Sequence, residues 1–448
     1  MHDALSPLDG RYQNEVASLC PYFSEAALIH ARITVEVRYF IALCKLLHKK
    51  INEKKLLGLV DKFSASTFKK IKTIESRTNH DVKAIEYYLR EHIKKHQEFI
   101  HFGITSEDVN NLAYGLLIHE SLKKVLIPSI TSLIVDLKRI AKASGSSRLL
   151  SLTHGQPATP TTLQKELLVF TDRLERQIQI LKNFRMQGKF GGAVGNLAAH
   201  FAAYPNMRWE SFAKKFVEAH GLTHLPRTTQ INPHDDIAQL SHIFHRMDSI
   251  LLNLSQDMWL YISRDIFIQR TKNSEIGSST MPHKVNPIDF ENAEGNLGLA
   301  RTLFHHFSEK LPVSRLQRDL SDSTVERNIG VAFGYHLLAV RSLAKGIAKL
   351  SINTKRMAEE LRAHPEIAAE LIQTVLRAHG ISDAYENLKT ITRGKIVSAA
   401  DLKTFIKATK LPLEAKTRLL RLIQKTEITN WLRPSTFSRG LDPKYLTI

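Results

Sequence analysis

The chain has 448 residues, of which 43% are hydrophobic, and its 63 lysines and arginines outnumber 44 aspartates and glutamates, giving a formal net charge of +19. No apolar run approaches the roughly 20 residues of a membrane-spanning helix, the N-terminus lacks a signal-peptide pattern, and Cys20 and Cys44 suit neither a metal site nor a disulfide framework. Basic residues are spread over short patches such as 49–55 and 91–96, which favours a dispersed basic surface or an anionic substrate over nucleic-acid binding. We therefore expect a cytoplasmic globular protein.

The first elements predicted along the chain are short, mixed helices up to residue 105, followed by much longer helices. Thr105 is followed three positions later by Asp108, which is the pattern of a helix capping box. Beyond it, three apolar seams advance in steps of three and four residues: Leu126, Ile130, Leu133, Leu137 and Ile140; Leu163, Leu167, Phe170, Leu174, Ile178 and Leu181; and Ile237, Leu240, Phe244, Met247, Leu251, Leu254, Met258 and Tyr261. This heptad spacing predicts an all-α fold with a central bundle of long helices.

Helix boundaries are also marked in the sequence. Thr159 before Pro160 has the form of an N-cap followed by a first-turn proline, and residues 232–236 lead into the third seam in a similar way. The predicted domains are an N-terminal helical domain over 1–105, the long-helix domain over 106–363 and a C-terminal helical domain over 364–448. The end of the chain, from residue 407, is basic and is expected to be irregular.

Four loops between these helices share an unusual chemistry: T-N-H-D-V (78–82), H-F-G-I-T-S-E-D (101–108), T-H-G-Q-P-A-T-P (153–160) and G-S-S-T-M-P-H-K-V-N-P (277–287). Each combines histidine or hydroxyl residues with turn-forming residues. Taken singly, His80 could lie on a helix surface, Thr105 could be a simple cap and His101 could pack inside. His154 is harder to explain structurally, because its turn neither caps nor packs in an obvious way. Together the four loops indicate a catalytic site.

The fourth loop resembles the signature loop of the fumarase/aspartase superfamily, whose members eliminate across a C–N or C–O bond and release fumarate. The segments N-H-D-V-K-A-I-E-Y-Y-L, H-F-G-I-T-S-E-D-V-N-N, T-H-G-Q-P-A-T-P and I-D-F-E-N-A-E-G-N are similar to those of the adenylosuccinate lyase family of the longer bacterial type. Residues 6–12 and 311–327 agree with that family as well. The resemblance covers residues 5–406 and thins beyond them.

The resemblance implies a three-domain, all-α lyase with an oligomeric helical core. The implied reaction is β-elimination of fumarate from adenylosuccinate, giving AMP, and from succinyl-aminoimidazole-carboxamide ribotide, giving AICAR, in purine biosynthesis. Such a reaction needs a base for the carbon-bound proton, an acid for the leaving nitrogen and cations for the charge that develops on a carboxylate. It needs no cofactor and no metal ion.

Catalytic roles also follow from the resemblance. Ser278 matches the base, which must be activated by surrounding donors and cations because no histidine adjoins it in the sequence. His154 matches the acid, a role that suits a group whose pKa lies near neutral pH. Lys284 and Asn286 are expected to bind the carboxylate whose charge grows. His80 is the rival for the acid, or a residue that binds substrate or orients His154.

The expected substrate carries a phosphate and two carboxylates, and guanidinium groups suit such anions well. The resemblance assigns substrate binding to Arg11, Tyr12, Asn79, His80, Asp81, His101, Thr105, Ser106, Gln230, Ser278, Lys284, Asn286, Asn292, Arg318, Ser323, Thr324, Val325, Glu326 and Arg327. Three alternatives stay open at this point. A sister lyase would act on a smaller substrate, a non-catalytic scaffold would resemble lens proteins that kept this fold, and a nucleic-acid-binding protein would rest on net charge alone.

The order of the loops also predicts an assembly. Residues 112–140 read as one helix, which at 1.5 Å per residue spans roughly 40 Å and which Pro128 can bend but not reverse. His101 precedes this helix and His154 follows it, so we expect the two loops of one chain to lie far apart. Antiparallel packing of several chains would bring such loops together. We therefore predict a homotetramer with sites built from three chains, as the resemblance also implies.

Overall fold

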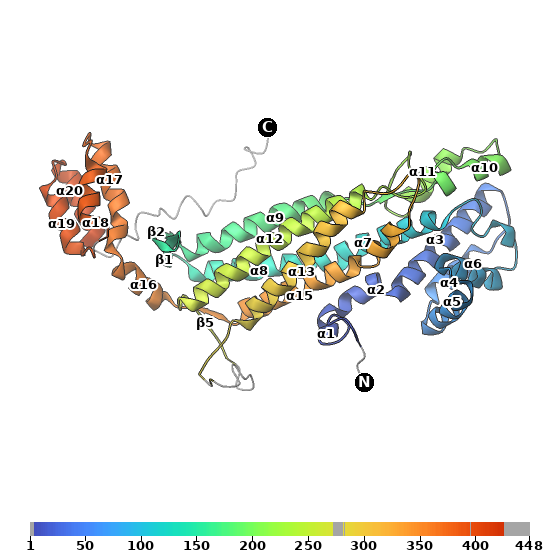
Figure 1. Cartoon of the computed structure of the whole chain (residues 1–448), viewed down its shortest axis with the longest axis horizontal. Coiled ribbons are helices and arrows are strands. Elements are labelled where there is room, and N and C mark those ends of the chain that lie inside the picture. The colour runs from blue at the N-terminus through green and yellow to red at the C-terminus, as the bar shows by residue number, and fades with distance from the viewer. Residues whose placement is uncertain (1–3, 272–280, 282, 395, 425–448) are drawn as a thin grey trace. The chain divides into compact units, whose positions relative to one another are not determined.

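The computed structural model describes residues 4–271, 281, 283–394 and 396–424 (Figure 1). The chain divides into two compact units. The first unit comprises Met1–Leu133, Leu174–Ser255 and Glu291–Ala344, and the second comprises Ile134–Arg173, Gln256–Phe290 and Lys345–Ile448. The all-α fold class is confirmed. The division into three domains at residues 105 and 363 stays a prediction.

Helices make up most of both units. Up to residue 183 they are α1 (Gln13–Val16), η1 (Ala17–Leu19), α2 (Cys20–Phe23), α3 (Glu25–Leu46), α4 (Glu53–Asp61), α5 (Ala65–Thr78), α6 (Asp81–His92), η2 (Gln97–Phe99), α7 (Ser106–Ser121), η3 (Leu122–Leu126), α8 (Ile127–Ser144) and α9 (Leu163–Asn183). After it come η4 (Gly192–Val194), α10 (Ala198–Ala203), α11 (Trp209–Glu218), α12 (Asp235–Ser263), α13 (Ile288–Lys310), α14 (Ser321–Glu326), α15 (Ile329–Ala348), α16 (Thr354–Ala363), η5 (Pro365–Ala368), α17 (Ala369–Ala378), α18 (Ala384–Thr392), α19 (Ala399–Ala408) and α20 (Leu413–Gln424).

The strands in the described part of the chain are short and pair in twos. They are β1 (Arg148–Thr153) with β2 (Gln156–Thr162), β3 (Gln187–Gly188) with β4 (Thr223–His224), and β5 (Phe267–Gln269) with β6 (Leu350–Ile352). The β3–β4 pair is parallel and the other two are antiparallel. These ribbons join or edge the helices and form no sheet core.

The long helix expected over 112–140 is confirmed and extended. It runs without a break through α7, the π-helical turn η3 and α8, from Ser106 to Ser144. In η3 the backbone N–H of Ile127 donates to the carbonyl of Leu122, five residues earlier. This irregular turn lies directly before Pro128, which has no N–H to donate to the helical ladder.

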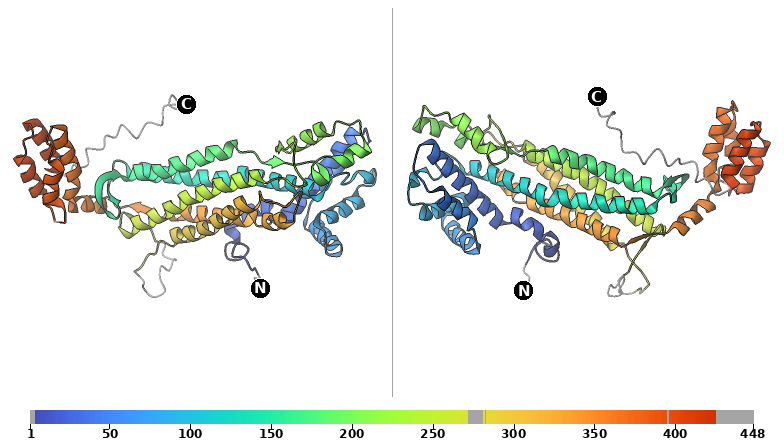
Figure 2. Two further views of the ribbon diagram at one scale, coloured as in Figure 1. Left: turned by 45° about the horizontal axis from the view of Figure 1, so that its top comes forward. Right: turned by 180° about the vertical axis from the view of Figure 1, so that it is seen from behind.

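The three apolar seams form the helix-packing surfaces, as predicted. Every seam residue is buried except Tyr261, which is half-buried. In the first unit, Phe244 of α12 stacks on Phe304 of α13 with ring centroids 5.3 Å apart, and Phe333 of α15 lies 4.9 Å from Phe244. Figure 2 shows these three helices running alongside one another. Burying a side chain of this size stabilises a fold by about 1.5–3 kcal/mol, so the seams account for the bundle.

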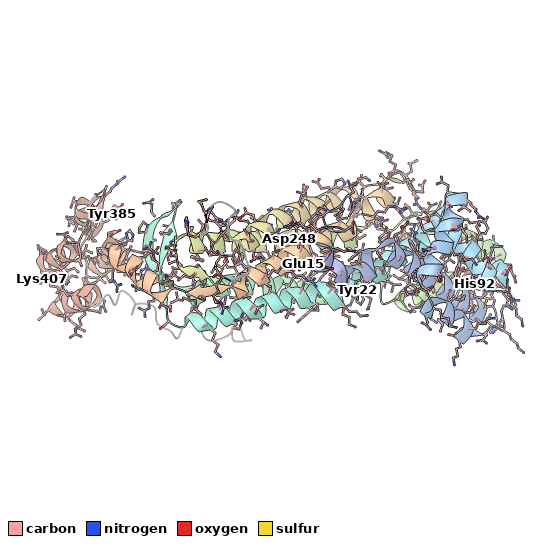
Figure 3. The ribbon with its side chains drawn as sticks, turned by 90° about the horizontal axis from the view of Figure 1, so that it is seen from below. Glu15, Tyr22, His92, Asp248, Tyr385 and Lys407 are labelled. Atoms are coloured by element: carbon pink, nitrogen blue, oxygen red, sulfur yellow. The ribbon has the colours of Figure 1, made fainter. Side chains whose placement is uncertain are left out.

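A buried hydrogen bond also joins α12 to α15. The Oδ1 atom of Asp248, labelled in Figure 3, lies 2.5 Å from Nδ1 of His336, and both side chains are fully buried. The pair falls one turn beyond the Phe244 contact. Because both side chains are fully buried, each needs the other as its polar partner where α12 packs on α15.

The prediction that Thr159 caps a helix with Pro160 in its first turn is wrong. Both residues lie in β2, and α9 begins only at Leu163. The hydroxyl of Thr162 accepts a hydrogen bond from the backbone N–H of Lys165 at 3.2 Å, so the cap lies three residues later. A proline is tolerated in β2 because a two-stranded ribbon has only edge strands.

The C-terminal helices of the second unit enclose their own apolar cluster, which includes Ile372, Leu376, Leu402, Ile406 and Leu419. The expectation of an irregular chain after residue 407 is wrong for its first part, because α20 continues as a helix from Leu413 to Gln424. None of the helices in the described ranges combines the length and apolar character needed to cross a bilayer.

Candidate active site

The predicted site residues divide between the two units. Those in the first unit are Arg11, Tyr12, Asn79, His80, Asp81, His101, Thr105, Ser106, Gln230, Asn292, Arg318, Ser323, Thr324, Val325, Glu326 and Arg327. His154, Lys284 and Asn286 belong to the second unit. Ser278, the predicted base, lies outside the described residues.

The loop 79–81 is positioned by the helices on either side of it. Asn79 ends α5 in the left-handed conformation, with φ of 51°. His80 is the N-cap of α6, and its Nδ1 accepts a hydrogen bond from the backbone N–H of Lys83 at 3.2 Å. His80 therefore has a structural role at the start of a helix. About half of its side chain is exposed, so Nε2 can make other contacts.

Asp81 joins two arginines at the start of α6. Its Oδ2 lies 2.9 Å from the guanidinium of Arg32 on α3 and 3.4 Å from that of Arg327 after α14. Burial raises the pKa of Asp81, but Arg32 and the backbone N–H of Val82 outweigh that effect, so the net pKa is lowered. The ionised carboxylate thereby holds the exposed Arg327 fork in place.

His101 makes an ion pair with a residue that sequence reasoning missed. Its Nδ1 lies 2.5 Å from Oε1 of Glu36, which is 1% exposed. Burial lowers the pKa of His101, but the charge and hydrogen bond of Glu36 raise it, and the net pKa is raised. Glu36 and Arg32 lie one turn apart on α3. Two opposite charges within that apolar stretch were the signal that could have found them.

The Thr105–Ser106 turn is fixed by Asp108, as the capping-box pattern predicted. The Asp108 carboxylate accepts from the N–H of Thr105 at 2.8 Å and from the N–H of Gly191 at 2.8 Å. It also pairs with Lys189 at 2.7 Å, and neither side chain is exposed at all. One carboxylate thus ties the predicted substrate turn to the glycine-rich loop 191–195.

Gln230 and Arg318 meet, as two predicted ligands of one substrate should. The side-chain Oε1 of Gln230 accepts from Arg318 at 3.1 Å, and its Nε2 donates to the carbonyl of Ala193 at 2.8 Å. Arg318 also lies 4.0 Å from the buried carboxylate of Glu107. The amide NH₂ of Gln230 therefore contacts the 191–195 loop, and its amide oxygen contacts Arg318.

Behind Arg318 lies a buried cluster of charged groups, which we call the His234 cluster: His234, Glu107, Asp322 and Glu326. The imidazole lies 3.6 Å from Glu326 and 3.9 Å from Asp322. Burial, followed by repulsion from Glu326, raises the pKa of Glu107 to about 8. The sequence assigned 232–236 only to a helix start, which is confirmed at Asp235. It gave no role to the His234 side chain or to Asp322.

Tyr12 and Asn292 also come together. The side-chain Nδ2 of Asn292 donates to the Tyr12 hydroxyl at 3.2 Å, while its Oδ1 accepts from Ser342 at 2.7 Å. The guanidinium of Arg11 lies 5.8 Å from the centre of the Tyr12 ring. The N-terminal segment is thereby attached to α13 and α15 with its arginine exposed.

In the second unit, His154 lies at the tip of the β1–β2 hairpin. Thr153 pairs with Gln156, so His154 and Gly155 form a two-residue turn with φ of 53° and 73°. The imidazole is exposed. Lys284 is exposed and Asn286 half-buried, just before α13. The catalytic roles of His154 and Lys284 stay predictions.

Several groups of the first unit are of the kind that binds anions. Arg11, Arg318 and Arg327 present guanidinium groups, each oriented by a neighbouring side chain, and hydroxyls of Thr105 and Ser106 lie at the start of α7. Within the described ranges, no group of three or more His, Cys, Asp or Glu side chains is arranged to hold a metal ion.

Comparison with protein families covers nearly the whole chain. Residues 10–301 match the family described as Lyase, and residues 314–428 match the family described as Adenylosuccinate lyase C-terminal. The second match extends beyond residue 406, where the sequence resemblance was expected to thin. It includes α19 and α20, so these helices belong to the family's C-terminal region.

Individual relatives agree. The chain is 49% identical to an adenylosuccinate lyase of Legionella pneumophila (strain Corby), over 95% of this chain and 96% of that one. It is 47% identical to that of Escherichia coli (strain K12), over 93% and 94%. Fumarate lyase from Mesorhizobium sp. BNC1 shares the fold, with a TM-score of 0.76 at 18% identity, over 93% of this chain and 95% of that one. The chain belongs to the adenylosuccinate lyase family of the fumarase/aspartase superfamily.

Proposed function

We propose that the protein catalyses the β-elimination of fumarate from adenylosuccinate, giving AMP, and from succinyl-aminoimidazole-carboxamide ribotide, giving AICAR, in purine biosynthesis. The observation that carries this proposal is the identity of 47–49% with adenylosuccinate lyases over nearly their whole length. The guanidinium groups in the first unit support it, because the substrate brings a phosphate of up to about two negative charges as well as carboxylates.

The proposed chemistry moves one proton off carbon and one onto nitrogen. Ser278 removes the proton from the carbon next to a carboxylate, and the electron pair of that C–H bond passes into the carboxylate, which becomes doubly charged. Lys284 and Asn286 stabilise this charge. The C–N bond then breaks, the pair re-forms as the double bond of fumarate, and His154 protonates the leaving nitrogen. His80 binds substrate or orients His154.

The anion-binding residues have matching roles. Arg318, Arg327 and Ser323 bind the phosphate or carboxylates, and Gln230 orients Arg318 through the hydrogen bond at 3.1 Å. Thr105 and Ser106 hold one carboxylate of the succinyl group through their hydroxyls, since the buried acids Glu107 and Asp108 weaken the helix dipole there. We further propose a cytoplasmic homotetramer in which each site takes residues from three chains.

The test is direct. Purified full-length protein is mixed with adenylosuccinate, and release of fumarate and AMP is followed by absorbance and by chromatography. We expect both products in equal amounts. Turnover of a smaller fumarate-releasing substrate without any action on adenylosuccinate would point to a sister lyase, and absence of both would contradict the proposal.

A further inference from the structure

The His234 cluster places one imidazole among three carboxylates from two other elements. His234 precedes α12, Glu107 lies on α7, and Asp322 and Glu326 lie one turn apart on α14. All four side chains are nearly inaccessible to solvent, at 1% to 3% exposure. Glu326 belongs to the expected substrate-binding run, whereas His234 and Asp322 have no role in the proposed chemistry.

The contacts of the imidazole with Asp322 and Glu326 are longer than ordinary hydrogen bonds. Both ring nitrogens of His234, Oε1 of Glu107, Oδ2 of Asp322 and Oε1 of Glu326 are buried without a hydrogen-bond partner. Separations of 3.6 and 3.9 Å from the imidazole are ion-pair distances. Buried carboxylates without compensation are costly. A positive charge on His234 offsets this cost at the centre of the cluster, and Arg318, 4.0 Å from Glu107, adds a second positive charge at its edge.

The backbone at His234 has an unfavourable conformation. Its φ is 59°, in the left-handed region that non-glycine residues seldom occupy. The side chain of Asn232 accepts from the His234 N–H at 3.0 Å and holds that conformation. A strained residue that points a buried imidazole at two acids of one short helix suggests a function for that helix.

That helix carries the expected anion-binding groups. Asp322 and Glu326 occupy the buried face of α14, while Ser323, Thr324 and Arg327 lie on its more exposed side. Arg318, just before α14, lies 4.0 Å from Glu107 in the same cluster. We propose that protonated His234 is a positioning residue, which anchors α14 and Arg318 so that their exposed groups meet the anionic substrate. This inference rests on the proposed function.

The protonation state agrees with this role. Burial lowers the pKa of His234, but Glu326 and then Asp322 and Glu107 raise it, to a net value of about 9. Other charged or titratable groups facing the cluster are Arg32, Arg318, Arg327, Tyr114 and Asp236. Because the folded-state pKa exceeds the ordinary 6.5, the imidazolium stabilises the cluster fully below pH 6.5 and that contribution is lost as the pH rises through about 9.

The first test compares His234→Gln, which loses the charge, with His234→Lys, which restores it. His220→Gln is the matched control, because His220 is buried in the same unit and its pKa is lowered to about 4, so it is neutral. With adenylosuccinate at pH 7.5, we expect His234→Gln to raise KM about tenfold while kcat changes much less. His234→Lys should recover most of the loss. An unchanged KM, or an equal rise in His220→Gln, would overturn the inference.

A second variant keeps the test sharp even if His234→Gln does not fold. Glu107→Gln removes an acid that favours the imidazolium once it is ionised, above about pH 8, and it changes the shape of the side chain little. In the wild type KM should rise as the pH passes through about 9, and in Glu107→Gln this rise should begin at lower pH. An identical pH profile would refute a charged His234. If the wild type itself releases no fumarate, the proposed function fails; if it does and the variants match it, only the role of His234 fails.

Discussion

Several side chains of the first unit hold one another in position through hydrogen bonds and ion pairs. Asp81 is the clearest case, since its carboxylate contacts Arg32 at 2.9 Å and Arg327 at 3.4 Å. Arg32 is in turn fixed by Asn110, whose Oδ1 accepts from it at 2.9 Å. Rotamer freedom of an arginine is costly to lose on binding. A guanidinium already held by such a chain of contacts loses less when an anion arrives.

The predicted base gives the sharpest test at this scale. Ser278→Ala should reduce kcat for adenylosuccinate by about 10³-fold while nucleotide binding survives, because the change removes only the proton acceptor. Steady-state kinetics and equilibrium binding of AMP measure the two effects separately. Ser279→Ala, one position on in the same loop, is the control. Turnover near that of the wild type in Ser278→Ala would mean that another group is the base.

Lys284→Ala should behave differently. Its cation is expected to contact the substrate carboxylate both before and during the transition state, so KM should rise and kcat should fall together. The same assay measures both constants. A rise in KM alone would assign Lys284 to ground-state binding only.

At the scale of elements, α7 and the loop 191–195 form one structural piece. Asp108 accepts from Gly191 and pairs with Lys189, and Lys189 also donates to the carbonyl of Gly192 at 2.9 Å. The loop's Ala193 carbonyl accepts from Gln230. The Asp108–Lys189 pair therefore connects the turn at Thr105 to the 191–195 loop. That loop in turn contacts the side-chain amide of Gln230, which binds Arg318.

Breaking this pair should destabilise the fold. Lys189→Met leaves the Asp108 carboxylate buried without its cation, and we expect a loss of about 3–5 kcal/mol in the free energy of unfolding. Chemical denaturation measures it. Lys45→Met, which removes half of an exposed pair with Glu53, should change stability by less than about 1 kcal/mol. Equal losses of unfolding free energy in the two variants would show that the buried pair stabilises the fold no more than the exposed pair.

At the scale of the whole molecule, the expected catalytic groups come from both units. The arginines proposed to bind the anionic substrate belong to the first unit, and His154 and Lys284 belong to the second. The helical run from Ser106 to Ser144 lies between His101 and His154 in the sequence, and at 1.5 Å per residue its axis is about 58 Å long. The length of this helix is the basis of the prediction that each site takes its two histidines from different chains.

Subunit mixing tests the shared site. His154→Gln and Ser278→Ala proteins, each inactive alone, are dissociated together and reassembled. If the two residues come from different chains, random mixing should give intact pairs in about a quarter of the sites, and activity should recover to that extent. Light scattering checks the mass of the assembly. Mixed tetramers without recovered activity, or full activity in an isolated monomer, would rule out sharing.

The sequence by itself determined the helices, their packing seams and the family. Heptad spacing is a local property, so the seams through Leu133, Leu174 and Phe244 could be read directly, and all three residues are buried. The helix starts at Thr105 and before Ile237 depended on caps within three or four residues. The loop motifs were equally local, and 47–49% identity with the relatives bears out the family they indicated.

Only the tertiary structure decided which charges meet. Lys189 finds Asp108 and His234 finds Glu326 across long stretches of chain, and no periodic pattern encodes such pairings. The β1–β2 hairpin was missed for a related reason: Thr159 before Pro160 suits a helix start locally, but pairing with residues 148–153 places it in a strand. Local preferences amount to fractions of a kcal/mol per residue, whereas an unpaired buried charge costs several. The folded chain therefore follows the long-range pairing wherever the two conflict.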